Sequence, residues 1–186
     1  MSVPNGWAES VLAHALARPG RLGPGRLVCI DGPAGSGKTT LALQVAEHTG
    51  APVVRMDDLY PGWDGLFAVE PEVLGLLQPL AEGRTGCYRR YDWLAEEYRE
   101  QHCVEPAPLL LLEGVGSGNL AWQELVTTLV WVEAPDDVRL RRGLARDGEE
   151  QRERWTQWML DESRLFAEEG TRARADLVFR SGDGEL

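Results

Sequence analysis

The chain has 186 residues, of which 43% are hydrophobic and 26% charged, with 30 acidic against 19 basic residues. This length predicts one domain, spanning residues 1–186, and the net charge of −11 argues against a nucleic-acid binder, which needs a basic surface. The longest aliphatic run, residues 109–112, is far shorter than the roughly 20 residues that span a bilayer. We therefore expect neither a nucleic acid nor a membrane as partner.

The start of the sequence lacks the basic and apolar stretches of a signal peptide. The three cysteines, Cys29, Cys87 and Cys103, are scattered and form no C-x-x-C pattern. Such a set is typical of a reducing compartment. We predict a cytoplasmic protein with neither a disulfide framework nor a zinc site.

Short β-rich runs alternate with helical patterns along the whole chain. A helix at residues 7–17 and a glycine- and proline-rich linker form an N-terminal segment, residues 1–25. Apolar strands without polar alternation are buried on both faces, which is typical of a parallel sheet. We predict a three-layer α/β fold, a five-stranded parallel sheet with helices on both faces. The predicted strands are 27–31, 53–57, 109–113, 129–133 and 176–180, and the further helices are 38–48, 72–81, about 92–101, and most of the chain from 135 onward.

The first of these strands leads into a segment that satisfies the pattern G-x-x-x-x-G-K-[ST]. Its glycines let backbone N–H groups turn inward around a polyphosphate, and the next helix adds the positive end of its dipole. Lys38 is the only lysine among 19 basic residues; it supplies an ammonium group for the phosphates, and the Thr39 hydroxyl ligates Mg²⁺. We therefore predict Mg-ATP binding. The predicted nucleotide-binding residues are Gly32, Pro33, Ala34, Gly35, Ser36, Gly37, Lys38, Thr39, Thr40 and, from the lid described below, Arg139.

Carboxylates end two of the predicted strands. Glu113 ends the strand 109–113, where an acid can hold Mg²⁺ beside the phosphates. Asp57 ends the strand 53–57, where it faces the γ-phosphate and can accept a proton from an acceptor hydroxyl. A plain strand-end or helix-capping role remains the alternative for each.

An arginine cluster marks a predicted helical lid at about residues 138–152. Arg139, Arg142 and Arg146 are spaced i, i+3, i+7, so that a helix presents them on one face. Guanidinium groups in this arrangement suit the oxygens of a phosphoryl group in transfer. The alternative is a solvated helix whose arginines pair with neighbouring aspartates. We predict Lys38, Asp57, Arg142 and Arg146 as catalytic residues, with Thr39 and Glu113 as the Mg²⁺ ligands.

The order of these motifs resembles the uridine kinase family of P-loop kinases from about residue 27 to residue 180. The family's Asp-x-Phe-Tyr, Phe-Asp-His-Pro, Tyr-Asp-Phe and Phe-Glu-Gly segments are similar to Asp57-Asp58-Leu59-Tyr60, Trp63-Asp64-Gly65-Leu66, Tyr91-Asp92-Trp93 and Leu112-Glu113-Gly114, and its arginine-rich lid is similar to residues 137–147.

The resemblance implies a strand order of 2-3-1-4-5 and phosphoryl transfer from ATP to a hydroxyl of a nucleoside-like small molecule. The predicted acceptor-site residues are Asp58, Tyr60, Trp63, Asp64, Tyr91, Asp92 and Arg99. Gly65 and Glu96 stand where the family has histidines, so a kinase for an antibiotic, a sugar or a cofactor precursor remains an alternative. A nucleotide-binding regulatory ATPase is a third reading. The sequence gives no oligomeric state.

Overall fold

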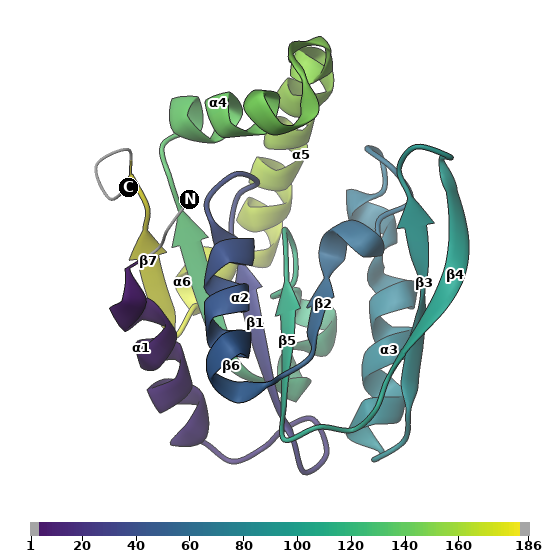
Figure 1. Ribbon diagram of the computed structural model, residues 1–186, viewed down its shortest axis with the longest axis vertical. Coiled ribbons are helices and arrows are strands. Elements are labelled where there is room, and N and C mark those ends of the chain that lie inside the picture. The colour runs from purple at the N-terminus through teal and green to yellow at the C-terminus, as the bar shows by residue number, and fades with distance from the viewer. Residues whose placement is uncertain (1–3, 183–186) are drawn as a thin grey trace.

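A five-stranded parallel sheet forms the centre of the computed structural model, which describes residues 4–182 and so leaves residues 1–3 and 183–186 of the predicted domain outside the described residues (Figure 1). Its strands are β1 (Arg26–Asp31), β2 (Val53–Arg55), β5 (Leu109–Glu113), β6 (Val126–Glu133) and β7 (Leu177–Arg180). They lie in the order β2-β5-β1-β6-β7. With these five strands numbered along the chain, that order is the predicted 2-3-1-4-5, which is confirmed.

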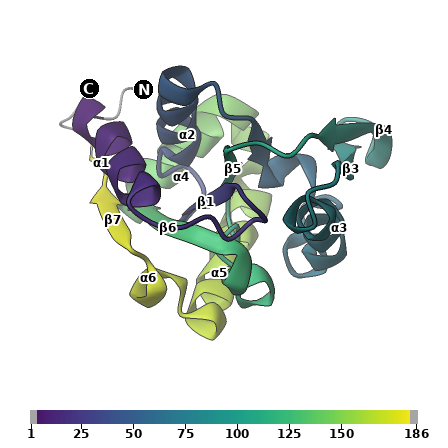
Figure 2. The ribbon, with the colours of Figure 1, turned by 90° about the horizontal axis from the view of Figure 1, so that it is seen from below.

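Helices cover both faces of the sheet, which gives the predicted three layers (Figure 2). The helices α1 (Asn5–Leu16) and α2 (Lys38–Thr49) pack on one face against Val28 and Ile30 of β1. On the other face, α3 (Glu70–Ala81) and α5 (Arg152–Glu169) pack against Leu27 and Cys29. Alternate residues of one strand therefore enter two separate cores, as expected for a strand buried on both sides.

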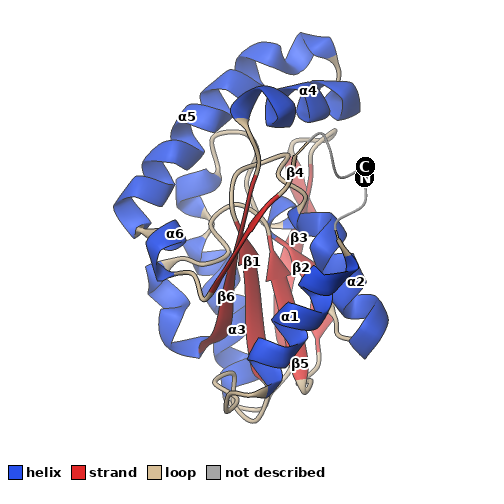
Figure 3. Ribbon diagram, turned by 90° about the vertical axis from the view of Figure 1, so that its left-hand side faces the viewer, coloured by secondary structure: helices blue, strands red, loops and turns tan. Residues whose placement is uncertain are grey.

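The predicted lid falls on α4 (Asp136–Asp147), a short 3₁₀ helix at Glu149–Gln151, and the start of α5. The helix α4 crosses above the ends of the strands where the phosphate-binding loop lies (Figures 1 and 3). Gly143 of α4 allows this helix to pack closely on α5, because a Cβ atom at that position would collide with the Trp155 ring of α5. A short helix, α6 (Thr171–Arg174), then leads into β7. Within residues 4–182, no helix is long and apolar enough to cross a membrane.

The predicted helix at 92–101 is wrong. This segment belongs to an antiparallel hairpin of β3 (Gly86–Asp92) and β4 (Glu97–Val104), which lies beside α3 at the edge of the molecule (Figure 1). Its alanine and glutamates favour a helix, but Glu96 adopts a positive φ of 54° and turns the chain. Because β4 is mostly exposed on both faces, its residues carry no alternating apolar pattern that would have indicated a strand.

The hairpin also overturns the expectation that the chain has no disulfide. Cys87 and Cys103 are 16 residues apart in sequence and form a disulfide across β3 and β4. The antiparallel register places these two residues directly opposite each other. The pairing was hidden because it depends on a hairpin that the sequence did not indicate. Cys29 is a free thiol, buried in β1.

Candidate phosphoryl-transfer site

The phosphate-binding loop, which we call the P-loop, comprises residues 32–39, from the end of β1 to the first two residues of α2. Gly35 and Gly37 have positive φ angles of 78° and 105°, which favour glycine. A Cβ atom on Gly35 would also lie 2.8 Å from the backbone oxygen of Arg139, so the loop and the lid helix are in close contact. The segment folds as the motif predicts, with helix α2 beginning at Lys38.

Lys38 is buried at the foot of the P-loop, with 6% of its surface exposed. Its Nζ donates a hydrogen bond to the carbonyl of Pro33 at 2.9 Å. Burial lowers the pKa of Lys38, and the carboxylates of Glu113 and Glu162 oppose this change. The ammonium group is thus held among acidic side chains, where an incoming phosphate would find a fixed positive charge.

The two predicted Mg²⁺ ligands lie together. The Thr39 hydroxyl donates to Oε1 of Glu113 at 2.9 Å. Burial, and next the charge of Asp57, raise the pKa of Glu113 to about 7, while Lys38 opposes the rise. In residues 4–182 no group of three or more His, Cys, Asp or Glu side chains forms a metal site. One hydroxyl and one or two carboxylates fit a Mg²⁺ ion that takes its other ligands from phosphate and water.

Asp31 is a further buried acid that the sequence reasoning did not assign to the site. It ends β1 and accepts backbone N–H bonds from Gly32 at 2.6 Å and from Gly116 and Gly118 at 2.8 Å each. Burial raises the pKa of Asp31 to about 6, although these three hydrogen bonds oppose the rise. Asp31 therefore joins the start of the P-loop to the loop that follows Glu113. The signal for it was an acid directly before the first glycine of the motif.

A pocket of about 790 Å³ opens above the P-loop, and most of the predicted site residues line it. It joins phosphate-binding residues to the acidic tip of β2, the lid and a wall of aromatic rings. Arg55, Arg154, Trp155 and Trp158 also line it, which the sequence reasoning did not assign to specific roles in the site. The predicted residues that line this pocket are Ala34, Gly35, Gly37, Lys38, Thr39, Thr40, Asp57, Asp58, Tyr60, Trp63, Glu113, Arg142 and Arg146.

Asp57 and Asp58 lie just beyond β2, which ends at Arg55 rather than at the predicted residue 57. A 3₁₀ turn at Met56–Asp58 carries both acids. Asp57 is exposed to the pocket, and its backbone carbonyl accepts a hydrogen bond from Nε1 of Trp93 at 2.8 Å. Asp58 is half-buried, and burial raises its pKa while Arg55 opposes the rise. Of these two acids, Asp57 therefore has the carboxylate that is more exposed to the pocket.

Aromatic rings form one wall of this pocket. Trp63 makes edge-to-face contacts with Trp93, Trp155 and Trp158 at 5.6, 6.4 and 6.0 Å between ring centres. The ring of Tyr60 packs on Trp158, and its hydroxyl donates to the carbonyl of Val115, so Tyr60 offers a ring rather than a free hydroxyl. Aromatic faces of this kind suit a planar or apolar part of a ligand.

A smaller pocket of about 380 Å³ adjoins the larger one and shares with it the residues Trp63, Trp93, Arg154 and Trp158. Asp64 and Tyr91 line this smaller pocket rather than the larger one, together with Glu96. Asp92 and Arg99 line neither pocket. The Asp92 carboxylate caps the hairpin turn by accepting two backbone N–H bonds, and it pairs with Arg99 at 3.2 Å. The structure therefore separates these four predicted acceptor residues from the P-loop.

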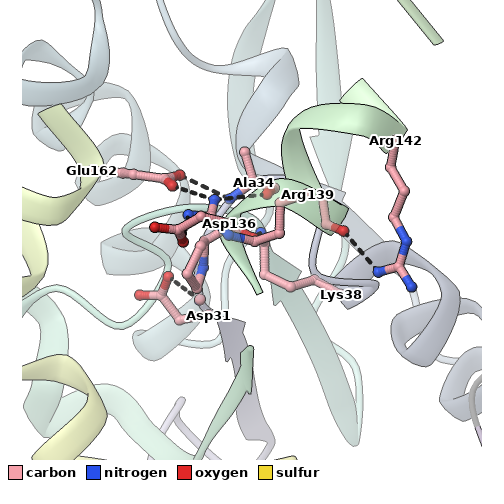
Figure 4. A network of polar contacts seen from close by, with 10 residues as sticks. Asp31, Ala34, Lys38, Asp136, Arg139, Arg142 and Glu162 are labelled. Carbon is pink, nitrogen blue, oxygen red and sulfur yellow. Dashed lines mark hydrogen bonds and ion pairs between the residues drawn. The ribbon is translucent and has the colours of Figure 1, made fainter. Parts of the chain in front are cut away.

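The three lid arginines have different partners, although all three lie on α4. Arg146 lines the pocket and pairs with Asp147 at 2.7 Å. Arg142 also lines it and donates to the backbone carbonyl of Gly35 at 3.1 Å. Arg139 is buried outside both pockets, where it contacts Glu162 and the backbone of Ala34 (Figure 4). Glu162 is not among the predicted site residues.

Comparisons with known proteins bear on the fold. The structure of a "Possible Uridine Kinase" from Bacillus stearothermophilus superposes with a TM-score of 0.68 at 20% identity, covering 94% of this chain and 97% of that chain. The "putative fructose transport system kinase" from Silicibacter sp. TM1040 superposes with a TM-score of 0.63 at 20% identity, covering 94% and 98%. These likenesses show the fold of the P-loop kinases. No curated protein sequence matches the chain at a significant level.

A family profile described as an AAA domain, AAA_18, matches residues 28–166. The matched range includes the P-loop, Asp57, Glu113 and the lid. Because it covers most of the chain, the protein belongs to the AAA_18 family of P-loop domains.

Proposed function

We propose that the protein is a small-molecule kinase that transfers the γ-phosphoryl group of Mg-ATP to a hydroxyl of a nucleoside-like acceptor. The observation that carries the proposal is that one pocket contains Lys38, the Thr39–Glu113 pair and Asp57, and continues to the tryptophan wall. A nucleotide-binding module without transfer needs neither a carboxylate facing the phosphates nor a second subsite. Phosphoryl transfer needs both, because it depends on positioning the acceptor and on stabilising the charge of the transition state.

Each group would have one task. Thr39 and Glu113 would hold Mg²⁺, which neutralises charge on the phosphates. Lys38 and Arg146 would stabilise the charge that spreads over the phosphoryl oxygens. Asp57 would accept the proton of the acceptor hydroxyl as its oxygen bonds to phosphorus, with ADP as the leaving group. Trp63 and Trp93 would bind the face of the acceptor.

A second candidate is a kinase for a non-nucleoside alcohol, such as a sugar. The observation that favours it is Glu96, which stands where the resembled family has a histidine and which lines the smaller pocket. A carboxylate can accept hydrogen bonds from several hydroxyls, as a sugar would offer. The fructose named for one structural relative belongs to that protein, and it gives a reason to include sugars among the acceptors tested.

A cytoplasmic location remains a prediction, and the Cys87–Cys103 disulfide would be uncommon there.

The test is ADP release by the purified protein with a panel of nucleosides, sugars and small alcohols, with each product identified by mass spectrometry. We expect release to depend on one class of acceptor. Asp57→Asn should lower kcat by about 10²–10⁴-fold while leaving nucleotide binding unchanged. Glu47→Gln, an exposed carboxylate at the far end of α2, is the matched control. Equal ADP release with and without every acceptor would instead indicate an ATPase, and unchanged transfer in Asp57→Asn would remove its role.

A further inference from the structure

Four successive carbonyl groups of the P-loop are held by side chains. Backbone N–H groups of this loop face inward, so its carbonyls point outward and need partners elsewhere. Only one of the four partners belongs to the loop itself. The pairs are Pro33 with Lys38 at 2.9 Å, Ala34 with Arg139 at 3.1 Å, Gly35 with Arg142 at 3.1 Å, and Ser36 with Ser181 at 2.8 Å.

The peptide groups of Ala34 are held on both sides. The Ala34 N–H donates to Oε2 of Glu162 at 2.8 Å, and the Ala34 carbonyl accepts from Nη1 of Arg139 at 3.1 Å. The same Nη1 donates to Oε1 of Glu162 at 2.6 Å (Figure 4). Ala34, Arg139 and Glu162 thus form a closed ring of hydrogen bonds, which we call the Ala34 clamp. It ties the P-loop to both helices of the lid.

The two side chains of the clamp are buried charges. Arg139 is 5% exposed and Glu162 is 1% exposed. Burial raises the pKa of Glu162, while the Ala34 N–H and the charge of Arg139 oppose the rise. Asp136, a largely exposed residue at the start of α4, also pairs with Arg139 at 2.7 Å. A buried ion pair contributes little net stability compared with apolar residues of similar size. We therefore expect this buried ion pair to contribute to the geometry of the site rather than to the stability of the fold.

The clamp leaves other N–H groups free for a ligand. Within the described part of the chain, no hydrogen bond occupies the N–H groups of Gly35 and Gly37. The Gly35 N–H belongs to the same peptide group as the Ala34 carbonyl, and Gly37 lies two residues further along the loop, so the orientation of this peptide group sets where the Gly35 N–H points and how the loop runs on to Gly37. Arg139 lines neither pocket, and its Nη1 and Nη2 atoms contact Glu162, Ala34 and Asp136, which leaves its buried Nε without a hydrogen-bond partner in the described residues.

We propose that Arg139 and Glu162 are positioning residues, which fix the Ala34 peptide so that the following N–H groups converge on the phosphates. Arg139 acts through the protein backbone and does not contact the nucleotide. The proposal rests on nucleotide binding at the P-loop, but not on phosphoryl transfer. It replaces the expectation that Arg139 belongs to the set of nucleotide ligands.

The first test measures the affinity for ADP and for a non-hydrolysable ATP analogue by calorimetry, with no acceptor present. Glu162→Gln keeps the size of the side chain and removes its charge. We expect about tenfold weaker binding of both nucleotides, because a hydrogen bond to a charged group is lost from the cradle. Glu168→Gln is the matched control, since Glu168 lies on the same helix in an exposed pair with Arg164 at 2.8 Å. It should bind both nucleotides as the wild type does.

A double variant separates positioning from stability. Arg139→Met/Glu162→Met removes both buried charges and keeps apolar side chains of similar length, so the fold should survive with little change in Tm. We expect its nucleotide affinity to fall at least as far as in Glu162→Gln. Wild-type affinity in a folded double variant would overturn the clamp.

The ratio of the two affinities tests the rival role of Arg139. If Arg139 bound the γ-phosphate, Arg139→Met would weaken the binding of the ATP analogue much more than the binding of ADP. Glu162→Gln would then leave both affinities unchanged. That result would overturn the positioning role. A wild-type protein that binds neither nucleotide would contradict both the positioning role of the clamp and the proposed function. A wild type that binds nucleotide but transfers no phosphoryl group would defeat only the proposed function.

Discussion

The phosphate side and the acceptor side of the pocket are held in place by different interactions. On the phosphate side, buried charged groups of α4 and α5 bind the backbone of the P-loop. On the acceptor side, tryptophan rings from the loop after β2, the hairpin and α5 contact one another edge to face, and Trp93 remains 37% exposed. Hydrogen bonds fix distance and angle closely, whereas aromatic contacts tolerate several arrangements.

This difference separates the chemistry from the choice of acceptor. Phosphoryl transfer requires the same geometry whatever molecule accepts the group, and that geometry depends on the polar side. The molecule accepted depends on the aromatic side, where one ring can be exchanged without disturbing the P-loop. We expect substitutions on the two sides to change different kinetic constants.

Among the tests of this comparison, the largest effect is expected on the phosphate side. In Lys38→Arg the planar guanidinium does not fit a site that is 6% exposed. We expect kcat/KM for ATP to fall by about 10²–10³-fold, which is the usual cost of losing one preorganised donor. Steady-state ADP release measures it, with the acceptor KM as internal control. An equal rise in the acceptor KM would show that the two sides are not separable.

An intermediate effect is expected where the two sides meet. Trp93→Phe keeps a ring but removes the Nε1–H that binds the Asp57 carbonyl at 2.8 Å. We expect kcat to fall by about 3- to 10-fold, the value of one neutral hydrogen bond, with nucleotide affinity unchanged. Trp93→Ala should in addition raise the acceptor KM. Weaker nucleotide binding in Trp93→Phe would contradict the comparison.

The smallest effect is expected at the side chain of Glu133, which lines neither pocket. The hydrogen bond from Arg172 contributes most to lowering the pKa of Glu133 from 4.5 to about 2, and Arg180 and Trp131 add to it. Because the folded pKa is below the ordinary value, the stabilisation is present above pH 4.5 and is lost as pH falls towards 2. Both arginines are largely exposed, so screening reduces the contribution to about 1 kcal/mol.

Glu133→Gln should remove this part of the acid dependence. The free energy of unfolding, measured in urea between pH 6 and pH 3, should therefore decline less steeply than in the wild type. Activity should stay near the wild-type value, which makes this variant the reference for the other two. A slope identical to that of the wild type would contradict the role of the ion pairs.

Local patterns sufficed for the sheet and the P-loop, because each depends on a short run of residues. The apolar runs of β1, β5 and β6 and the motif at 32–39 indicate their structure without knowledge of distant partners. The hairpin could not be found this way, because strand pairing overrode the helix propensity of its residues. Glu162 could not be found either, since its partner Ala34 is 128 positions away in sequence.

The contact between Ser181 and the P-loop can form only at the end of protein synthesis. The Ser181 hydroxyl reaches the Ser36 carbonyl across 145 positions of sequence, just after the last strand of the sheet. During synthesis, the P-loop therefore leaves the ribosome long before α4, α5 and β7 can hold its carbonyls. Contacts between such distant segments form slowly, and domains of this size commonly pass through intermediates. A nascent chain that lacks these last segments should carry the complete motif and still bind nucleotide poorly.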